Sequence, residues 1–173
     1  MSSLTDHLFR TLAAVSPGSR LLDLECGDRT VTHALAALGF DLHATASRTE
    51  VAVRTQHAVA TAFPALADRV ITAAPRALGY PDHFFEWVVA LGSYDAIEAD
   101  RLGDALAETR RVLKPGGWVF VAVRDGADVS PDWLDERMQD AHFAIAERPK
   151  RDEGADGGVV RGIYRKVDRD VIG

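Results

Sequence analysis

Residues 102–123, which read LGDALAETRRVLKPGGWVFVAV, carry the clearest structural pattern in the chain. The first half of this stretch repeats apolar side chains at the spacing of one helical face, which predicts a helix over residues 98–113. The Lys-Pro-Gly-Gly sequence at 114–117 predicts a tight turn. The apolar run at 118–123 is short and predicts a buried strand. A helix, a turn and a buried strand in close succession are typical of an α/β protein.

The alternation of strands and helices extends from this stretch toward both ends of the chain. Short apolar runs predict buried strands, and apolar positions three and four residues apart predict helices. The predicted strands span residues 20–26, 41–46, 69–74, 86–91, 118–123, 142–148 and 159–167, and the predicted helices span 4–15, 29–38, 47–63, 98–113 and 131–141. Such alternation predicts a parallel sheet with helices on both faces. The short connection between the last two strands makes that pair antiparallel.

The third predicted helix begins at a recognisable capping pattern. Ser47 stands three residues before Glu50 in the sequence Ser-Arg-Thr-Glu, which is the spacing of a capping box. We therefore expect the Ser47 side chain to cap this helix.

Length and composition limit the class of protein. The chain has 173 residues, a formal net charge of −6 and no cluster of basic residues. These features predict one domain over residues 1–173, with a helix and lead-in at 1–19 and a core at 20–167, and they argue against a nucleic-acid partner. The single cysteine, Cys26, excludes an intramolecular disulfide, and no apolar run reaches the roughly 18 residues of a membrane span. We expect a cytoplasmic protein without a membrane partner.

The loop after the first strand is the first candidate site, because ligands of an open α/β sheet bind beyond the carboxyl ends of its strands. Residues 25–29 read Glu-Cys-Gly-Asp-Arg and precede a predicted helix. Backbone N–H groups at the start of a helix favour an anionic or acceptor group. A dinucleotide-binding loop would show the pattern G-x-G-x-x-G, whereas Gly27 is the only glycine of this loop. The loop therefore argues against a nicotinamide-dependent enzyme.

Three stretches together carry a family resemblance. Residues 21–28 read LLDLECGD, residues 80–89 read YPDHFFEWVV and residues 107–117 read AETRRVLKPGG. In this order and spacing they resemble the first motif, the entry to the fourth strand and the turn before the fifth strand of class I S-adenosylmethionine (SAM)-dependent methyltransferases, of the methyltransferase type 11-like group. The resemblance covers roughly residues 18–167.

The resemblance implies a fold, a cofactor and a set of site residues. The fold is a three-layer α/β sandwich, a Rossmann-like methyltransferase fold with a seven-stranded mixed sheet of order 3-2-1-4-5-7-6. The cofactor is SAM and the methyl acceptor a small molecule. Because the sulfonium already activates the methyl group, positioning supplies much of the rate and no universal catalytic residue follows from the fold. By this likeness the cofactor-binding candidates are Asp23, Glu25, Cys26, Gly27, Asp28, Thr45, Ala46, Ala74, Pro75 and Leu91, and the substrate-facing candidates are Gly92, Ser93 and Tyr94.

Several cofactor positions depart from the family pattern. Glu25 stands where the family has its first motif glycine, and Arg29 stands near the third. The second strand ends at Thr45 and Ala46 instead of in the acid that holds the ribose hydroxyls. Ala74 stands where an acid often contacts the adenine. Losing a charged acceptor costs about 1.5–3 kcal/mol. Two hypotheses stay open: weak or altered SAM binding, or a methyltransferase fold that has lost SAM and serves as a binding or interaction module.

Other candidates also have alternatives. Glu25 would crowd the methionine end of SAM, bind the ammonium group of that end, or point to solvent. Cys26 is expected to be a buried thiol, and Ser93 and Tyr94 either line a substrate cleft or pack the loop. The scattered histidines show no metal-ligand spacing, so no metal is expected. The short loops after the fourth to sixth strands leave the cleft open, which predicts a homodimer that completes the site or a shallow pocket.

Overall fold

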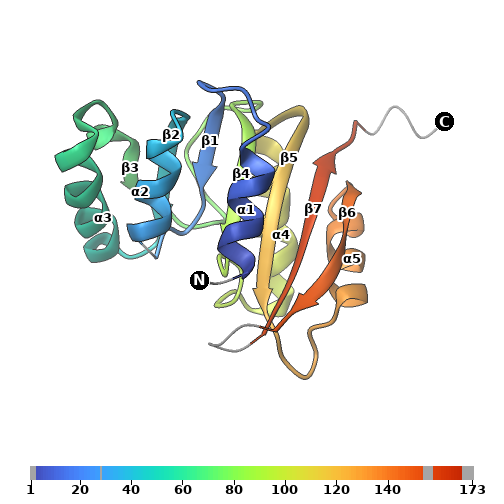
Figure 1. Ribbon diagram of the computed structural model, residues 1–173. Helices are drawn as coiled ribbons and strands as arrows, with labels where there is room; N and C mark the ends of the chain where they lie inside the picture. Colours follow the sequence, from blue (N-terminus) through green and yellow to red (C-terminus); the bar gives the residue numbers. More distant parts are fainter. Residues whose placement is uncertain (1–2, 28, 154–157, 169–173) are drawn as a thin grey trace.

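The computed structural model, which describes residues 3–27, 29–153 and 158–168, contains a seven-stranded sheet. The strand order is β3-β2-β1-β4-β5-β7-β6 (Figure 1). Helices lie on both faces of this sheet. The fold class and the strand order predicted from the sequence are therefore confirmed.

The pairing of the strands sets where their ends meet. The strands are β1 (Arg20–Asp23), β2 (Asp41–Ala46), β3 (Val70–Thr72), β4 (Phe85–Leu91), β5 (Leu113–Arg124), β6 (Phe143–Asp152) and β7 (Val159–Lys166). β1 pairs in parallel with β2 on one side and with β4 on the other, and the β2–β3 and β4–β5 pairs are parallel as well. β7 lies antiparallel between β5 and β6, as predicted for the last pair. The chain thus places β2 and β3 on one side of β1, and then returns to place β4 and the later strands on the other side.

The helices make the sheet the middle of three layers (Figure 1). They are α1 (Ser3–Leu12), α2 (Arg29–Ala37), α3 (Thr49–Ala62), α4 (Ala99–Val112) and α5 (Pro131–Asp140), with a 3-10 helix η1 (Pro64–Arg69). α1 and α2 bury Leu8, Leu12 and Leu35 in one apolar cluster, whereas α4 and α5 bury Leu102 and Met138 in another. Each face of the sheet therefore has its own core. None of the helices in the described part of the chain is long and apolar enough to cross a membrane.

The Lys-Pro-Gly-Gly sequence lies inside a strand and does not form a separate turn. β5 already begins at Leu113, and its register with β4 is interrupted over the first residues. Gly116 has a φ of 71°, a left-handed conformation that glycine adopts without strain. A Cβ on Gly117 would lie 2.9 Å from the carbonyl oxygen of Lys114, so a side chain does not fit there. The predicted turn is therefore a local irregularity at the start of β5.

The capping-box prediction for the third helix is wrong. α3 begins at Thr49, its N-cap is Arg48, and no side chain caps it. Glu50 accepts a 2.8 Å hydrogen bond from Nε of Arg48 instead of reaching back to Ser47. The Ser47 hydroxyl donates to Glu25 of the β1–α2 loop. A long-range partner has therefore replaced the local one.

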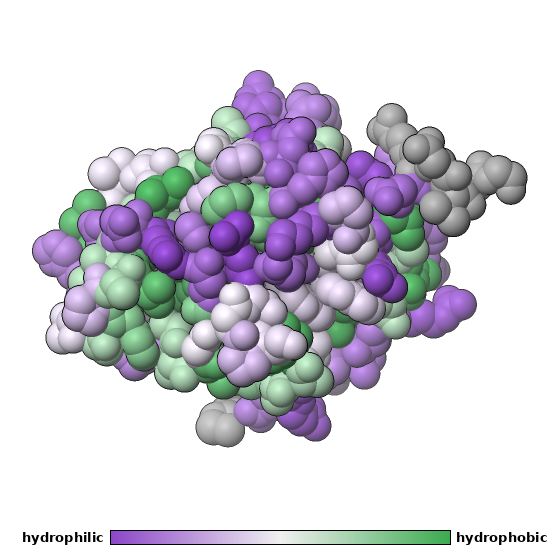
Figure 2. Space-filling view, turned by 90° about the horizontal axis from the view of Figure 1, so that it is seen from above, coloured by the Kyte–Doolittle hydropathy of each residue, from purple (hydrophilic) through white to green (hydrophobic). Residues whose placement is uncertain are grey.

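Polar contacts connect the elements at one edge of the sheet. Figure 2 views the molecule from the side at which the parallel strands begin, and hydrophilic residues gather across the centre of that view. Here Oε2 of Glu86 accepts the backbone N–H of Arg20 at 2.6 Å, and Oε1 of Glu86 binds Nζ of Lys114. We call this side the amino edge, and the opposite side the carboxyl edge.

Candidate functional site

The ends of β1, β2 and β4 converge at the carboxyl edge, in the lower part of Figure 1. β1 ends at Asp23, which lies between Ala44 of β2 and Val89 of β4 in the sheet register. Because the strand order changes direction between β1 and β4, this is the switch point at which open α/β sheets bind ligands. The loops that the sequence singled out therefore begin side by side.

Two short hydrogen bonds fix the loops at this point. Asp23 is 5% exposed, and its Oδ2 accepts a hydrogen bond from Thr32 Oγ1 at 2.6 Å, which ties β1 to α2. Ser93 Oγ donates to the carbonyl oxygen of Leu24 at 2.5 Å, which ties the loop after β4 to the end of β1. Both bonds lie in the interior, so they hold the two loops in a defined relative position.

Glu25 joins the ends of two strands. Its φ is 58°, a left-handed conformation that costs a non-glycine residue about 1–2 kcal/mol. Its backbone N–H donates to Thr45 Oγ1 at 3.4 Å. Its carboxylate turns toward the end of β2, where Oε1 accepts the Ser47 backbone N–H at 2.9 Å and the Ser47 hydroxyl at 2.7 Å. The side chain therefore reaches from the β1–α2 loop to the residue that follows β2.

The second carboxylate oxygen of Glu25 has no hydrogen-bond donor. Oε2 is shielded from solvent, and no residue in the ranges 3–27, 29–153 and 158–168 donates to it. A shielded acceptor without a donor costs about 1–3 kcal/mol. A bound ligand that donates a hydrogen bond to Oε2 would recover this cost.

The residues after Glu25 complete the described part of the loop. Cys26 is buried, as expected, and its backbone N–H donates to the carbonyl oxygen of Thr45 at 2.6 Å. Burial, followed by the nearby negative charge of Asp23, raises the pKa of the Cys26 thiol to about 12, so the thiol stays protonated and weakly reactive. Gly27 has open space where a side chain would begin. Asp28 lies outside the described residues.

The ends of β2 and β3 present small side chains. Thr45 and Ala46 are fully buried, and the Thr45 hydroxyl is occupied by the backbone N–H described above. The carbonyl oxygen of Ala46 accepts the backbone N–H of Ala73 at 3.0 Å, which brings the loop after β3 beside the end of β2. In that loop Ala74 is exposed and Pro75 is buried. These cofactor-binding candidates therefore lie at or beside the end of β2, which Glu25 contacts through Thr45, but they bring no carboxylate of their own.

The substrate-facing candidates lie at and after the end of β4. Leu91 ends the strand half-buried, and Gly92 follows it, exposed and with a φ of 69°. Ser93 and Tyr94 are buried. The Tyr94 hydroxyl shares a 2.7 Å hydrogen bond with Thr109 Oγ1, and burial raises the pKa of Tyr94. The hydroxyls of Ser93 and Tyr94 are thus used inside the protein, and Gly92 is the exposed member of the three.

Sequence reasoning missed Ser47 as a site residue. The Ser-Arg-Thr-Glu pattern assigned it to a helix cap, and Glu25, its partner, lies 22 residues earlier. One signal was present in the sequence: an unexpected acid at position 25 occurs together with a missing acid at the end of the second strand. No local pattern connects those two positions.

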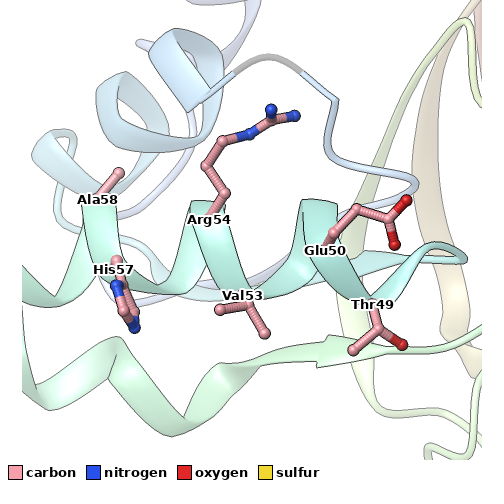
Figure 3. Close-up of a pocket in the computed structure, with 6 residues that line it drawn as sticks. All are labelled: Thr49, Glu50, Val53, Arg54, His57 and Ala58. Carbon is pink, nitrogen blue, oxygen red and sulfur yellow. The ribbon is translucent and has the colours of Figure 1, made fainter.

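A hollow of about 840 Å³ runs along α3 (Figure 3). It is lined by Thr49, Glu50, Val53, Arg54, His57 and Ala58. In Figure 3, Glu50 and Arg54 extend toward the side of α2 and the β1–α2 loop, whereas Val53 and His57 point to the other side of α3. The hollow begins two residues after Ser47, but its lining comes from one helix and includes none of the predicted site residues.

Comparison with protein families identifies the group to which the chain is related. Residues 22–121, more than half of the chain, match the family model described as a methyltransferase domain. The chain belongs to the class I SAM-dependent methyltransferase family. A comparison with curated proteins found no match.

Several solved structures share the fold of this family member. A SAM-dependent methyltransferase from Methanosarcina mazei matches with a TM-score of 0.74 and 17% identity, over 91% of this chain and 97% of its own. The 1,6-didemethyltoxoflavin-N1-methyltransferase of Burkholderia thailandensis, solved with 1,6-didemethyltoxoflavin and S-adenosylhomocysteine, matches with a TM-score of 0.75 and 16% identity, over 95% and 77%. The [4+2]-cyclase SpnF matches with a TM-score of 0.75 and 21% identity, over 95% and 80%. At these identities the likeness establishes the fold alone.

Proposed function

We propose that this methyltransferase-family chain transfers the methyl group of SAM to a small molecule. The observation that carries the proposal is the convergence of the β1, β2 and β4 ends at the switch point, with the Glu25 carboxylate and the open space at Gly27 beside it. When bound, SAM supplies a methyl group that its sulfonium has already activated. The similarity to the Burkholderia enzyme, whose name specifies a small-molecule acceptor, supports that class of substrate.

The residues at the switch point fit a ligand that carries donors and positive charge. Glu25 offers a carboxylate with an unused oxygen, and a carboxylate favours both hydroxyl donors and a cation. Gly27 lets a ligand approach the backbone closely, because nothing lies within 4 Å of the place where its side chain would start. Asp23 contributes by holding α2 through Thr32. The full cofactor set we propose is Asp23, Glu25, Cys26, Gly27, Asp28, Thr45, Ala46, Ala74, Pro75 and Leu91.

These residues promote transfer by positioning. The Asp23–Thr32 and Ser93–Leu24 hydrogen bonds hold the loops after β1 and β4 at fixed places, so a ligand between them is oriented. Burial raises the pKa of the Tyr94 hydroxyl, so it stays protonated near neutral pH and does not act as a base. Orientation by the two loops is therefore the contribution we assign to this chain.

One observation favours the second hypothesis, a non-catalytic binding module. Oε1 of Glu25 already accepts two hydrogen bonds from Ser47 at the end of β2, where the resemblance implies contact with the cofactor. The similarity to a [4+2]-cyclase also illustrates that this fold does not fix one activity. Binding of the cofactor therefore decides between the two hypotheses.

Calorimetric titration with SAM and with S-adenosylhomocysteine tests the proposal. We expect saturable binding of both, and thermal stabilisation that grows with ligand concentration, because a ligand of the folded state stabilises it by about 2.7 kcal/mol at a hundredfold excess over Kd. The absence of both binding heat and thermal stabilisation at millimolar ligand would refute the proposal.

A pair of glycine variants locates the site. Gly27→Leu should abolish binding by filling the open space beside the loop. Gly103→Leu is the matched control, because Gly103 is also exposed with open space around it but lies on α4, and binding should persist there. Equal binding by both variants would place the ligand elsewhere.

A further inference from the structure

Glu25 brings a carboxylate to a strand end that has none of its own. β2 ends at Ala46, and the next residue, Ser47, holds Oε1 of Glu25 by two hydrogen bonds, at 2.9 and 2.7 Å. Thr45 holds the backbone N–H of Glu25 through its hydroxyl at 3.4 Å. The end of β2 therefore forms hydrogen bonds with both the backbone and the side chain of Glu25.

Two features of Glu25 destabilise the ligand-free protein. Its φ of 58° is a conformation that glycine would adopt without strain. Its Oε2 is shielded from water and accepts no hydrogen bond from the described part of the chain. Strained residues of this kind cluster at binding sites, where the surrounding structure enforces them. The unused oxygen shows what such a site lacks, which is a hydrogen-bond donor.

The chemistry of the missing donor follows from the position of the carboxylate. One oxygen is fixed by Ser47, so the other, which has no partner in the described part of the chain, is the one left for a ligand hydroxyl, and a carboxylate accepts such hydrogen bonds strongly. A ribose presents two adjacent hydroxyls. Thr45 and Ala46, at the strand end where an acid was expected to hold them, are buried and uncharged.

We propose that Glu25 accepts the ribose hydroxyls of SAM in place of an acid on β2. This inference rests on the proposed function, because it assigns a residue to SAM binding. The acid has moved from the end of one strand to the loop after its neighbour, and Ser47 holds it in the position that the strand end has lost. Glu25 is therefore a ribose-binding residue, and Ser47 is the residue that positions it.

Substitution of Glu25 combined with a change in the ligand tests this role. Glu25→Gln keeps the shape of the side chain and removes the charge, and it should weaken S-adenosylhomocysteine binding about ten- to a hundredfold in calorimetric titration. The 2′-deoxy analogue of the ligand should bind the native chain more weakly by a similar factor, and should bind Glu25→Gln no more weakly than the parent ligand does. Glu50→Gln, which removes an exposed charge two residues into α3, is the matched control and should bind as the native chain does.

Moving the carboxylate back provides a rescue. Glu25→Gly removes the acid and suits the left-handed backbone, so it should fold and bind weakly. Adding Thr45→Asp to that variant restores an acid at the end of β2 and should recover most of the lost affinity. Ser47→Ala should weaken binding less than Glu25→Gln, because it only releases the carboxylate from its support.

The outcomes separate the failure of this role from the failure of the proposed function. If the native chain binds neither SAM nor S-adenosylhomocysteine, both are overturned. If the native chain binds and Glu25→Gln binds equally well, only the ribose role fails. Tighter binding by Glu25→Gly than by the native chain would overturn the role in a different way, since Glu25 would then obstruct the ligand. Thermal melting of each variant, measured alongside, confirms that weak binding does not come from unfolding.

Discussion

Two glutamates, one at each edge of the sheet, show how differently the edges are built. At the amino edge, both carboxylate oxygens of Glu86 have donors, the backbone N–H of Arg20 at 2.6 Å and Nζ of Lys114. At the carboxyl edge, Glu25 has two donors on one oxygen and none on the other, and its backbone is strained. Burial alone would raise the pKa of Glu86, but the hydrogen bonds from Lys114 and Arg20 lower it.

The comparison separates residues that stabilise the fold from residues that serve a ligand. A satisfied carboxylate such as Glu86 has its partners within the protein, so removing it should cost stability. An incompletely satisfied one such as Glu25 would, by the role proposed for it, gain its last partner from a ligand, so removing it should cost binding and little stability.

The largest effect is expected at the amino edge, from Gly117→Ala. The added Cβ would lie 2.9 Å from the carbonyl oxygen of Lys114 and 3.2 Å from that of Glu86, and neither backbone atom can move cheaply. We expect a loss of about 1–3 kcal/mol in the free energy of unfolding, measured in urea. Gly103→Ala, on an exposed helical site with open space, should instead gain about 0.5–1 kcal/mol. Equal results for the two would show that the start of β5 is not closely packed.

Glu86→Ala should have the next largest effect. It leaves the backbone N–H of Arg20 without its 2.6 Å acceptor and Lys114 without its carboxylate. We expect a loss of about 1–2 kcal/mol in urea unfolding, reduced by the partial exposure of the pair. The control is Glu98→Ala, because Glu98 is exposed and its pair with Arg101 is 3.7 Å long, and it should change stability by no more than about 0.5 kcal/mol. If both variants lost equally little, the amino edge would not owe its stability to Glu86.

Glu25→Gly should change stability less than Glu86→Ala does. It loses the two hydrogen bonds from Ser47 but relieves the left-handed strain and removes the unsatisfied oxygen. The net change in unfolding free energy should lie between about 0 and 1 kcal/mol in favour of the variant. His142→Gly is the control for strain, because His142 has a φ of 63° and is exposed. A loss for Glu25→Gly as large as that for Glu86→Ala would remove the distinction between the edges.

The fold was the part that the sequence predicted well. Apolar spacing depends on neighbours within a few residues, and it predicted the alternation of strands and helices. The strand order did not follow from spacing, and it was the resemblance to the methyltransferase family that implied the order the structure has. The Gly116-Gly117 pair was recognised because steric demands on glycine are local, although its turn lies within β5. The secondary structure of the scaffold therefore follows from local features of the sequence.

The carboxyl edge depended on contacts that no local pattern contains. The bond from Ser47 to Glu25 spans 22 residues and competes with a helix cap that the sequence alone favours. The sequence could not show whether Tyr94 faces a cleft or the interior, because its hydrogen-bond partner Thr109 lies 15 residues later, on α4. The residues that set the positions of these side chains come together only when the sheet forms. The arrangement of the site therefore could not be predicted from the sequence.

The smallest effect is expected from His43, in the middle of β2 between the two edges. Its ring packs edge-on against Tyr80, Phe84 and Phe85 at centroid distances of 5.4–5.5 Å. Burial, and then the charge of Arg20, lower the pKa of His43 below its usual value of about 6.5. Between the folded pKa and about 6.5 the unfolded chain therefore binds a proton that the folded protein does not, so stability should fall as the pH drops below about 6.5.

The variant His43→Leu isolates that dependence on pH. Its unfolding free energy should fall less than that of the native chain between pH 7.5 and 5.5, both measured in urea. Some loss should remain, because burial and Arg161 also lower the pKa of His7. Equal losses in the two proteins would mean that His43 accepts its proton without cost. A smaller loss in the variant would show that the buried ring resists protonation, although Oδ1 of Asp41 lies 3.7 Å from its Nε2, because burial and the positive charge of Arg20 oppose a second cation there.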